Sequence, residues 1–236
     1  MEPTADAVAL GLVWYAAFLF SLTVHEAAHA LAALKLGDET AYLGGQVTLN
    51  PLPHIEREPF GTVLVPLLSY GLAGWVMGWA SAPYDPTWAD RHPKRAAWMA
   101  LAGPVSNLLV AAACGIVIRL AMVAGTLDAP DSANFTQITV AAAPGLWESL
   151  ATLLSILFSL NILLFAFNLL PLPPLDGAGV LPLLLKDEWV RGYQEFMRQP
   201  MFGLLGLLVA WRVFGQIFQP IHLLALNLLY PDIGYH

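Results

Sequence analysis

Four stretches of the chain are long and apolar enough to cross a lipid bilayer, and this feature limits most strongly how the chain can fold. They cover roughly 7–36, 96–124, 146–170 and 201–230. An α-helix rises about 1.5 Å per residue, so about 20 residues cross a hydrocarbon core of about 30 Å. The composition agrees, because 58% of the residues are apolar and 11% are charged, whereas soluble domains carry about 25% charged residues. We therefore predict an all-α polytopic membrane protein.

A fifth apolar run, 60–82, is interrupted by Pro66, Gly71, Gly74 and Gly78, and the positive charges decide its topology. If the run crosses the bilayer, eight connecting lysines and arginines divide six to two between the sides. If it enters and returns, all eight lie on one side. Cytoplasmic loops are rich in Lys and Arg, so we predict a re-entrant segment, an external N-terminus, and cytosolic connections at 37–95 and 186–199. The eight residues are Lys35, Arg57, Arg91, Lys94, Arg95, Lys186, Arg191 and Arg198.

The length, net charge and cysteine count limit which classes of protein the chain can belong to. We expect one integral-membrane domain over 1–236, with a core at 7–185 and a final span at 201–230. Lys and Arg number 10 against 17 Asp and Glu, a net charge of −7, which provides no basic surface for nucleic acid. The one cysteine, Cys114, excludes disulfides within the chain and any multi-thiolate metal site. The oligomeric state stays open.

The first span contains the pattern His-Glu-x-x-His, formed by His25, Glu26 and His29. Residues four apart share one face of a helix, so the two imidazoles can converge on one ion with Glu26 nearby. Two histidine nitrogens on zinc, with a glutamate as the base that activates water, form a known hydrolytic arrangement. The alternative is that neighbouring helices merely satisfy the three side chains. Ionisable groups inside an apolar span cost several kcal/mol, which favours a functional role.

Hydrolytic zinc sites usually take three protein ligands, and Asp176 is the candidate for the third. It is the only carboxylate between Glu148 and Asp187, and three nearby prolines (171, 173 and 174) unwind the chain before it. His25 lies roughly 26 Å into the first span, and the span 146–170 brings Asp176 to a similar depth. An ordinary turn aspartate before glycine is the alternative. We predict one zinc ion per chain, held by His25, His29 and Asp176.

These two motifs resemble those of the site-2 protease family of intramembrane zinc metalloproteases, in its small form without PDZ or CBS domains. The resemblance rests on His-Glu-Ala-Ala-His at 25–29 and Asn-x-x-Pro-x-x-x-Leu-Asp-Gly at 168–177, and it covers about 15–185. It implies His25, His29 and Asp176 as zinc ligands and Glu26 as the base. It also implies that Asn168 stabilises the oxyanion or holds the substrate backbone. A plain interhelical hydrogen bond from Asn168 remains open.

The resemblance implies hydrolysis of peptide bonds within or near the transmembrane segments of single-span membrane proteins. The site would lie towards the cytosolic side of a cell or inner membrane. Residues 41–49 have a strand-like composition with a Gly-Gly break, in the region of the family's membrane-associated β-loop. A strand there could pair with an unwound substrate by β-augmentation. A simple cytosolic hairpin is the alternative.

Two other functions compete with proteolysis. A catalytically silent relative would bind membrane segments without cutting them, but such a protein has no use for Glu26. A metal transporter would need further ligands along a path, and the sequence places none beyond Asp176. Asn107 follows Gly103-Pro104 in the second long span, and we predict that it packs helices together, with a catalytic role as the alternative. Arg119, near the outer end of that span, is expected to reach the interface.

Overall fold

A computed structural model describes residues 4–235 of the chain, and within them four long apolar helices are present. They are α1 (Ala5–Leu36), α6 (Pro93–Val123), α7 (Leu146–Asn168) and α10 (Pro200–Leu229). Each is long and apolar enough to cross a membrane. The predicted spans and the all-α polytopic class are therefore confirmed, and the chain is an integral membrane protein.

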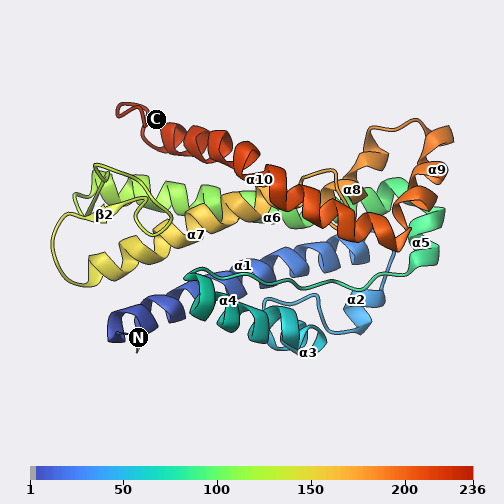
Figure 1. The fold of residues 1–236 in the computed structure, drawn as a ribbon, viewed down its shortest axis with the longest axis horizontal. Helices are drawn as coiled ribbons and strands as arrows, with labels where there is room; N and C mark the ends of the chain where they lie inside the picture. Colours follow the sequence, from blue (N-terminus) through green and yellow to red (C-terminus); the bar gives the residue numbers. More distant parts are fainter. Residues whose placement is uncertain (1–3, 236) are drawn as a thin grey trace.

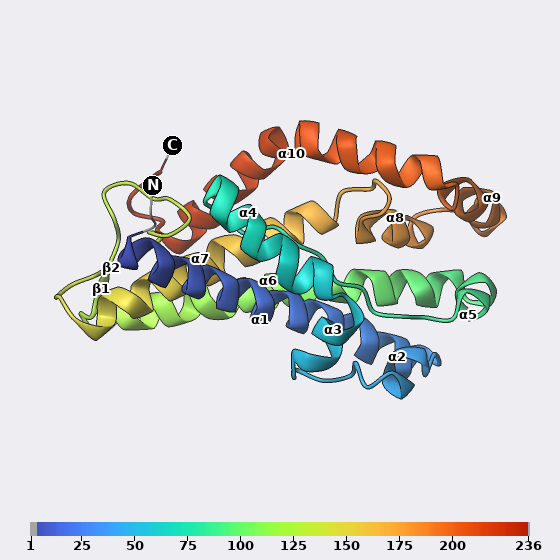
Figure 2. The ribbon, with the colours of Figure 1, turned by 60° about the horizontal axis from the view of Figure 1, so that its bottom comes forward.

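The four helices run alternately up and down the long axis, and the two chain ends lie at the same end of the molecule (Figure 1). Helices α1, α6 and α7 form the packed centre. Helix α10 is peripheral, since 17% of its most apolar stretch is buried against 56% of that of α7. It arches away from α7 over part of its length (Figure 2). The centre of the protein is thus a three-helix unit with a loosely packed fourth helix.

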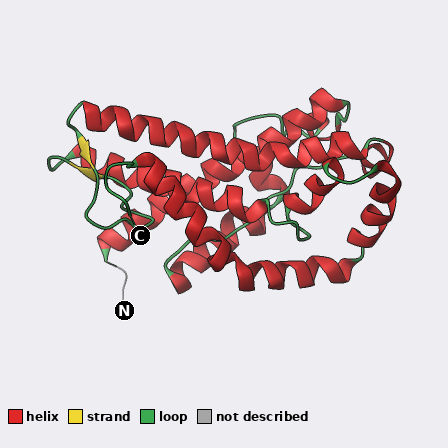
Figure 3. Ribbon diagram, turned by 90° about the horizontal axis from the view of Figure 1, so that it is seen from above, coloured by secondary structure: helices red, strands yellow, loops and turns green. Residues whose placement is uncertain are grey.

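Short helices fill most of the remaining connections, so the secondary structure is almost wholly helical (Figure 3). They are α2 (Thr40–Leu43), α3 (Leu52–Arg57), the π-helical turn η1 (Phe60–Leu64), α4 (Val65–Ala73), α5 (Pro86–Arg91), α8 (Asp176–Val180), the 3₁₀ turn η2 (Leu181–Leu183) and α9 (Asp187–Met197). In the described part of the chain, two strands are present, β1 (Leu127–Asp128) and β2 (Val140–Ala141), paired antiparallel.

The chain reverses direction within the apolar run 60–82, which agrees with the predicted re-entrant segment, while its position in a membrane stays a prediction. Helix α4 reaches the N-terminal part of α1, where the Tyr70 hydroxyl donates to the carbonyl of Ala7 at 2.8 Å. Gly74, with φ of +74°, ends this helix in the left-handed region that favours glycine. Residues 74–85, which we call the return segment, then run back without helix. Arg57 Nε donates to the carbonyl of Ser81 at 3.0 Å, so the two ends of the run meet.

The prediction of a β-loop at 41–49 is wrong. Helix α2 occupies its first part, and the rest consists of turns and bends. The Asp38 carboxylate accepts hydrogen bonds from the backbone N–H and the hydroxyl of Thr40, at 3.0 and 2.6 Å, and these bonds start a helical turn. Gly45, with φ of +72°, then reverses the chain. A strand also needs a neighbouring strand, and the described strands lie at the opposite end of the molecule (Figure 1).

The connection between α6 and α7 ties the outer end of α10 to the bundle. Phe135 stacks on Trp14 of α1 and on His222 of α10, with ring centroids 6.4 and 5.3 Å apart. The Tyr230 hydroxyl donates to the carbonyl of Ile138 at 2.9 Å. Arg119 donates to the carbonyl of Leu229 at 3.2 Å, at the negative end of the α10 dipole. This end of α10 is therefore anchored by hydrogen bonds and ring stacking, whereas its other half packs through Gly206 and Ala210 on the connection after α7.

Asp38 fixes the far end of the return segment, because its carboxylate also accepts from the backbone N–H of Asp85 at 2.9 Å. Burial would raise the pKa of Asp38, but the hydrogen bonds from Thr40 and Asp85 outweigh it and hold the pKa below its usual value. A lowered carboxyl pKa contributes stability above the unfolded-state pKa of about 4, and this stability is lost as pH falls through the folded value.

Asp38→Ala should therefore destabilise this end of the protein by about 2–3 kcal/mol near neutral pH, with a smaller difference in acid. The measurement is the thermal midpoint in detergent, together with cleavage of the region 38–92 by an added protease. The control is Asp187→Ala, whose side chain is 85% exposed and which should change little. An unchanged midpoint for Asp38→Ala at neutral pH would contradict this role.

Candidate metal centre and active site

The three predicted ligands meet at one point of the fold, although Asp176 is distant in the sequence from the two histidines. His25 and His29 lie one turn apart on α1, and Asp176 begins α8. Their donor atoms all lie within 4.8 Å of one another. The two Nε2 atoms are 3.0 Å apart, and the Asp176 oxygens lie 3.0 Å from His25 Nε2 and 3.3 Å from His29 Nε2. Both histidines are buried, at 4% and 5% exposure.

This spacing fits a small tetrahedral ion. Zinc binds nitrogen and oxygen ligands at about 2.0–2.1 Å, which places tetrahedral ligand atoms about 3.3 Å apart. The observed separations of 3.0–3.3 Å lie close to that value. His29 Nδ1 lies 2.8 Å from the carbonyl of Met99, which can only accept. In the neutral ring the proton of His29 is therefore on Nδ1. The lone pair on Nε2 then points towards the ligand atoms of His25 and Asp176.

Gly103 of α6 leaves the space that the histidines need. A Cβ atom at this position would lie 2.6 Å from His25 Nε2 and closer still to His29 Nε2. Any side chain would therefore collide with the two nitrogens. Because α6 faces α1 with a glycine, which has no side chain, both imidazoles can point into the space between the helices.

Asp176 reaches the histidines through a non-helical connection after α7. Residues 170–175 form turns, with the backbone N–H of Leu175 bonded to the carbonyl of Leu172 at 2.9 Å. Gly177 packs against the backbone of Leu169 and Leu170, where a side chain would collide with both carbonyls. Irregular backbone at membrane depth is tolerated where it is buried in protein or lines a cavity, and this segment does line one.

Glu26 stands beside the three ligand candidates and lines the same cavity. It is 4% exposed, and among the described residues its Oε2 atom has no hydrogen-bond partner. A buried carboxylate oxygen without a protein partner is costly unless water or substrate engages it. Glu26 is therefore placed to accept a proton from a molecule bound in the cavity.

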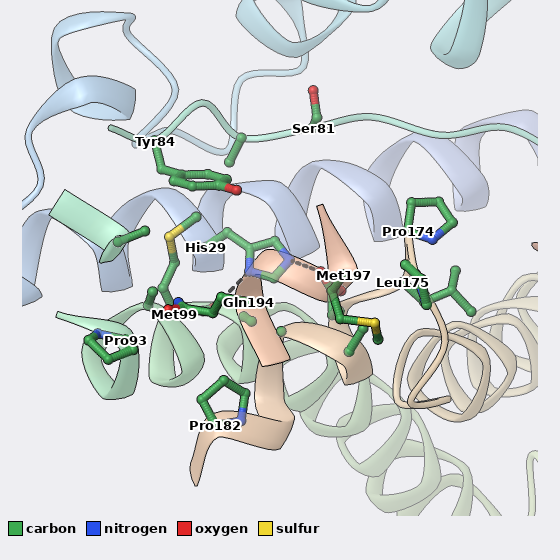
Figure 4. Close-up of a pocket in the computed structure, with 18 of the residues that line it drawn as sticks. His29, Ser81, Tyr84, Pro93, Met99, Pro174, Leu175, Pro182, Gln194 and Met197 are labelled. Carbon is green, nitrogen blue, oxygen red and sulfur yellow. Dashed lines mark hydrogen bonds and ion pairs between the residues drawn. The ribbon is translucent and has the colours of Figure 1, made fainter. Parts of the chain in front are cut away.

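The cavity has a volume of about 420 Å³ and reaches His29, Glu26 and Asp176. In Figure 4, Ser81 and Tyr84 of the return segment lie on one side of His29, while Pro182 and Gln194 lie on the other. Helix α9 thus forms part of the wall. An ion pair between Arg198 and Asp90 joins the end of α9 to α5.

The return segment lines the cavity with consecutive residues, Ala80, Ser81 and Ala82, and its backbone is hydrogen-bonded at alternate positions. The N–H of Trp79 bonds the carbonyl of Gly61 at 3.1 Å, and the carbonyl of Ser81 accepts from Arg57. Alternate residues of an extended chain direct their backbone groups to opposite edges. Ala80 and Ala82 line the cavity, and within the described chain their backbone groups make no hydrogen bond.

Two asparagines that the sequence analysis singled out, Asn168 and Asn107, are not among the candidate ligands. Asn168 is the last residue of α7 and is half-buried. It is not among the residues that line the cavity, and its implied role stays a prediction. Asn107 packs helices together, as predicted, since its Nδ2 donates to the carbonyl of Ser21 on α1 and to Asn161 Oδ1 on α7. Its Oδ1 also lies 2.6 Å from His25 Nδ1, a contact between residues 82 positions apart that sequence reasoning missed.

The fold and the site together define a polytopic membrane protein with a His-Glu-x-x-His motif inside its helix bundle, where His25, His29 and Asp176 could hold a metal ion. A family model described as "Peptidase family M50" matches residues 13–207. The chain belongs to this family, and the resemblance to site-2 proteases is thereby confirmed. Membership of a peptidase family favours proteolysis over the silent-relative and transporter alternatives.

Three relatives that carry the name "Putative zinc metalloprotease" resemble the chain along most of its length. YwhC of Bacillus subtilis is 32% identical over 221 residues, 86% of this chain and 91% of that protein. Rip2 of Mycolicibacterium smegmatis is 31% identical over 176 residues, 75% of this chain and 58% of its own length. Rip2 of Mycobacterium tuberculosis H37Rv is 29% identical over 218 residues, 92% and 74% respectively. No solved structure matches the chain.

Gly103→Ala should weaken metal binding at least tenfold, because the added methyl group collides with the two Nε2 atoms. An alanine in a helix interior is otherwise favourable by about 1 kcal/mol relative to glycine. The measurement is zinc content and affinity of the detergent-purified protein. Gly115→Ala on the same helix is the control, since its methyl group would meet Phe158 at an ordinary 3.5 Å. Full metal content in Gly103→Ala would show that the ion binds elsewhere.

Proposed function

We propose that the protein is a zinc-dependent endopeptidase that cleaves peptide bonds within or near the transmembrane segments of single-span membrane proteins. The observation that carries the proposal is the meeting of His25, His29 and Asp176 at tetrahedral ligand spacing, beside the unpartnered Glu26 and inside a membrane-spanning bundle. Family membership and the names of the relatives support the same chemistry.

In this proposal His25, His29 and Asp176 hold one zinc ion. Zinc, when bound, supplies a Lewis acid that makes water a nucleophile near neutral pH and polarises the peptide carbonyl. Glu26 Oε2 accepts the proton from the attacking water and then donates it to the leaving amine. The burial of Glu26 in the cavity wall and the lack of a protein partner for its Oε2 among the described residues leave that oxygen available for this transfer.

A transmembrane helix hides its peptide groups in its own hydrogen bonds, so a stretch of the substrate must unwind before it is cut. The return segment offers an edge on which an unwound peptide can form main-chain hydrogen bonds, through Ala80 and Ala82. This edge takes the place of the strand expected at 41–49. The peptide then lies in the cavity whose wall includes Glu26.

We also propose that the site opens towards the cytosol. Arg91, Lys94, Arg191 and Arg198 gather on α5, α9 and the start of α6, at the end of the molecule opposite both termini (Figure 1). Cytosolic loops of membrane proteins carry such an excess of positive residues. The cavity lies at the same end, since α5, the start of α6, α8 and α9 all line it.

Glu26→Gln should lower cleavage by about 10²–10⁴-fold, because an amide cannot take the proton, while zinc content stays near one ion per chain. His25→Ala and Asp176→Ala should lose both zinc and cleavage. The assay uses liposomes that hold the enzyme and a panel of single-span reporters tagged on both sides. Retained cleavage in Glu26→Gln would contradict the role of Glu26 as the base. Retained zinc in Asp176→Ala would place the third ligand elsewhere.

Ala80→Pro should reduce cleavage at least tenfold with zinc content unchanged, because proline removes a backbone donor from the proposed peptide-binding edge. Val47→Pro, within the stretch 41–49 that the sequence suggested, is the control and should leave cleavage within about twofold. A larger loss in Val47→Pro than in Ala80→Pro would reverse the assignment of the substrate edge.

A further inference from the structure

Three polar side chains lie buried behind the metal centre and belong to three different helices. Ser21 is on α1, Asn107 on α6 and Asn161 on α7, and each is 0% exposed. Burying an amide or a hydroxyl costs about 1–3 kcal/mol unless its hydrogen bonds are made. Here the three side chains bond one another and His25, in a series that runs from the carbonyl of Ala17 to the imidazole ring.

The carbonyl of Ala17, which can only accept, fixes which atom donates and which accepts in each hydrogen bond of this series. Ser21 Oγ donates its one proton to the carbonyl of Ala17 at 2.7 Å, so towards Asn161 it can only accept. Asn161 Nδ2 donates to Ser21 Oγ and to the carbonyl of Leu157, both at 2.8 Å. Both amide protons of Asn161 are thereby used, and its Oδ1 is left as an acceptor.

The same reasoning carries through to His25. Asn107 Nδ2 donates to Asn161 Oδ1 at 2.8 Å and to the carbonyl of Ser21 at 3.3 Å. Its Oδ1 must then be the atom that faces His25 Nδ1 at 2.6 Å, and it can only accept. The proton of the neutral His25 ring therefore lies on Nδ1, and the lone pair on Nε2 points at His29 and Asp176.

We propose that Ser21, Asn161 and Asn107 are positioning residues that set the proton and the ring orientation of His25 for metal binding. This inference rests on the zinc site proposed above. His29 reaches the same state through a separate partner, the carbonyl of Met99. The series that ends at His25 therefore couples the metal site to the packing of all three helices, α1, α6 and α7. Hydrogen-bond partners of metal-binding histidines are worth about 10–100-fold in metal affinity.

The test is zinc affinity, measured by competition with a chelator in the detergent-purified full chain. Asn107→Leu should bind zinc 10–100-fold more weakly. Asn107→Asp should recover part of that loss, because a carboxylate oxygen still accepts from Nδ1, although the donors to Asn161 Oδ1 and the Ser21 carbonyl are gone. Asn161→Leu, which does not touch His25, should bind about 3–10-fold more weakly because Asn107 loses the partner that orients it. Rescue by Asp is the readout that a purely structural role of Asn107 would not give.

Ser159→Ala is the matched control, because Ser159 is equally buried on α7 but contacts His222 instead of the series. It should leave zinc affinity within about twofold. If Asn107→Leu does not fold, Asn107→Asp and Asn161→Leu carry the test. Wild-type affinity in Asn161→Leu, or equal affinities in Asn107→Leu and Asn107→Asp, would overturn the proposal while the zinc site stands. A wild-type chain that binds no zinc would overturn the site itself, and the positioning role with it.

Discussion

The structure depends on two imidazoles and a carboxylate that face one another inside an apolar bundle. Each polar atom at that depth needs a partner, because hydrocarbon offers none and an unsatisfied group costs several kcal/mol. The partners come from other helices: Met99 and Asn107 from α6, and Asp176 from α8. Gly103 lets α6 approach closely enough to supply them. The chemistry of the site and the packing of the central helices are therefore one set of contacts.

Features set by local spacing or by length could be predicted from the sequence. The apolar stretch 146–170 becomes the helix Leu146–Asn168 because bilayer thickness fixes how much chain must be apolar. His25 and His29 share a face because the helix repeat requires it. Asp176 could be placed beside them from depth alone, since the first and third long spans run in the same direction and reach a common level. The reversal of the chain within 60–82 followed from its flanking charges.

Features set by partners distant in the sequence could not be predicted. The composition of 41–49 suits a strand, but a strand requires a neighbour, and the local bonds from Thr40 to Asp38 start a helical turn instead. The sequence marks Asn107 as polar inside a span, yet its partner His25 lies 82 positions away and nothing local indicates that pairing. The edge that faces the cavity, at Ala80 and Ala82, consists of backbone groups, which carry no sequence signal at all.

The distribution of packing divides the molecule into two parts with different tasks. In the proposed function, the metal ligands must be held to within a few tenths of an ångström, and both histidines lie on α1, which packs with α6 and α7. The same proposal requires a substrate helix to enter from the membrane and unwind, which a rigid wall would prevent. The opposite wall is accordingly made from the return segment, α8 and α9, with the sparsely buried α10 beyond them. Asp176 is the one ligand on that side, and it is held by proline-rich turns and by Gly177 against the end of α7. The third ligand candidate therefore depends on packing at the end of α7, although its own helix α8 lies in the opposite wall.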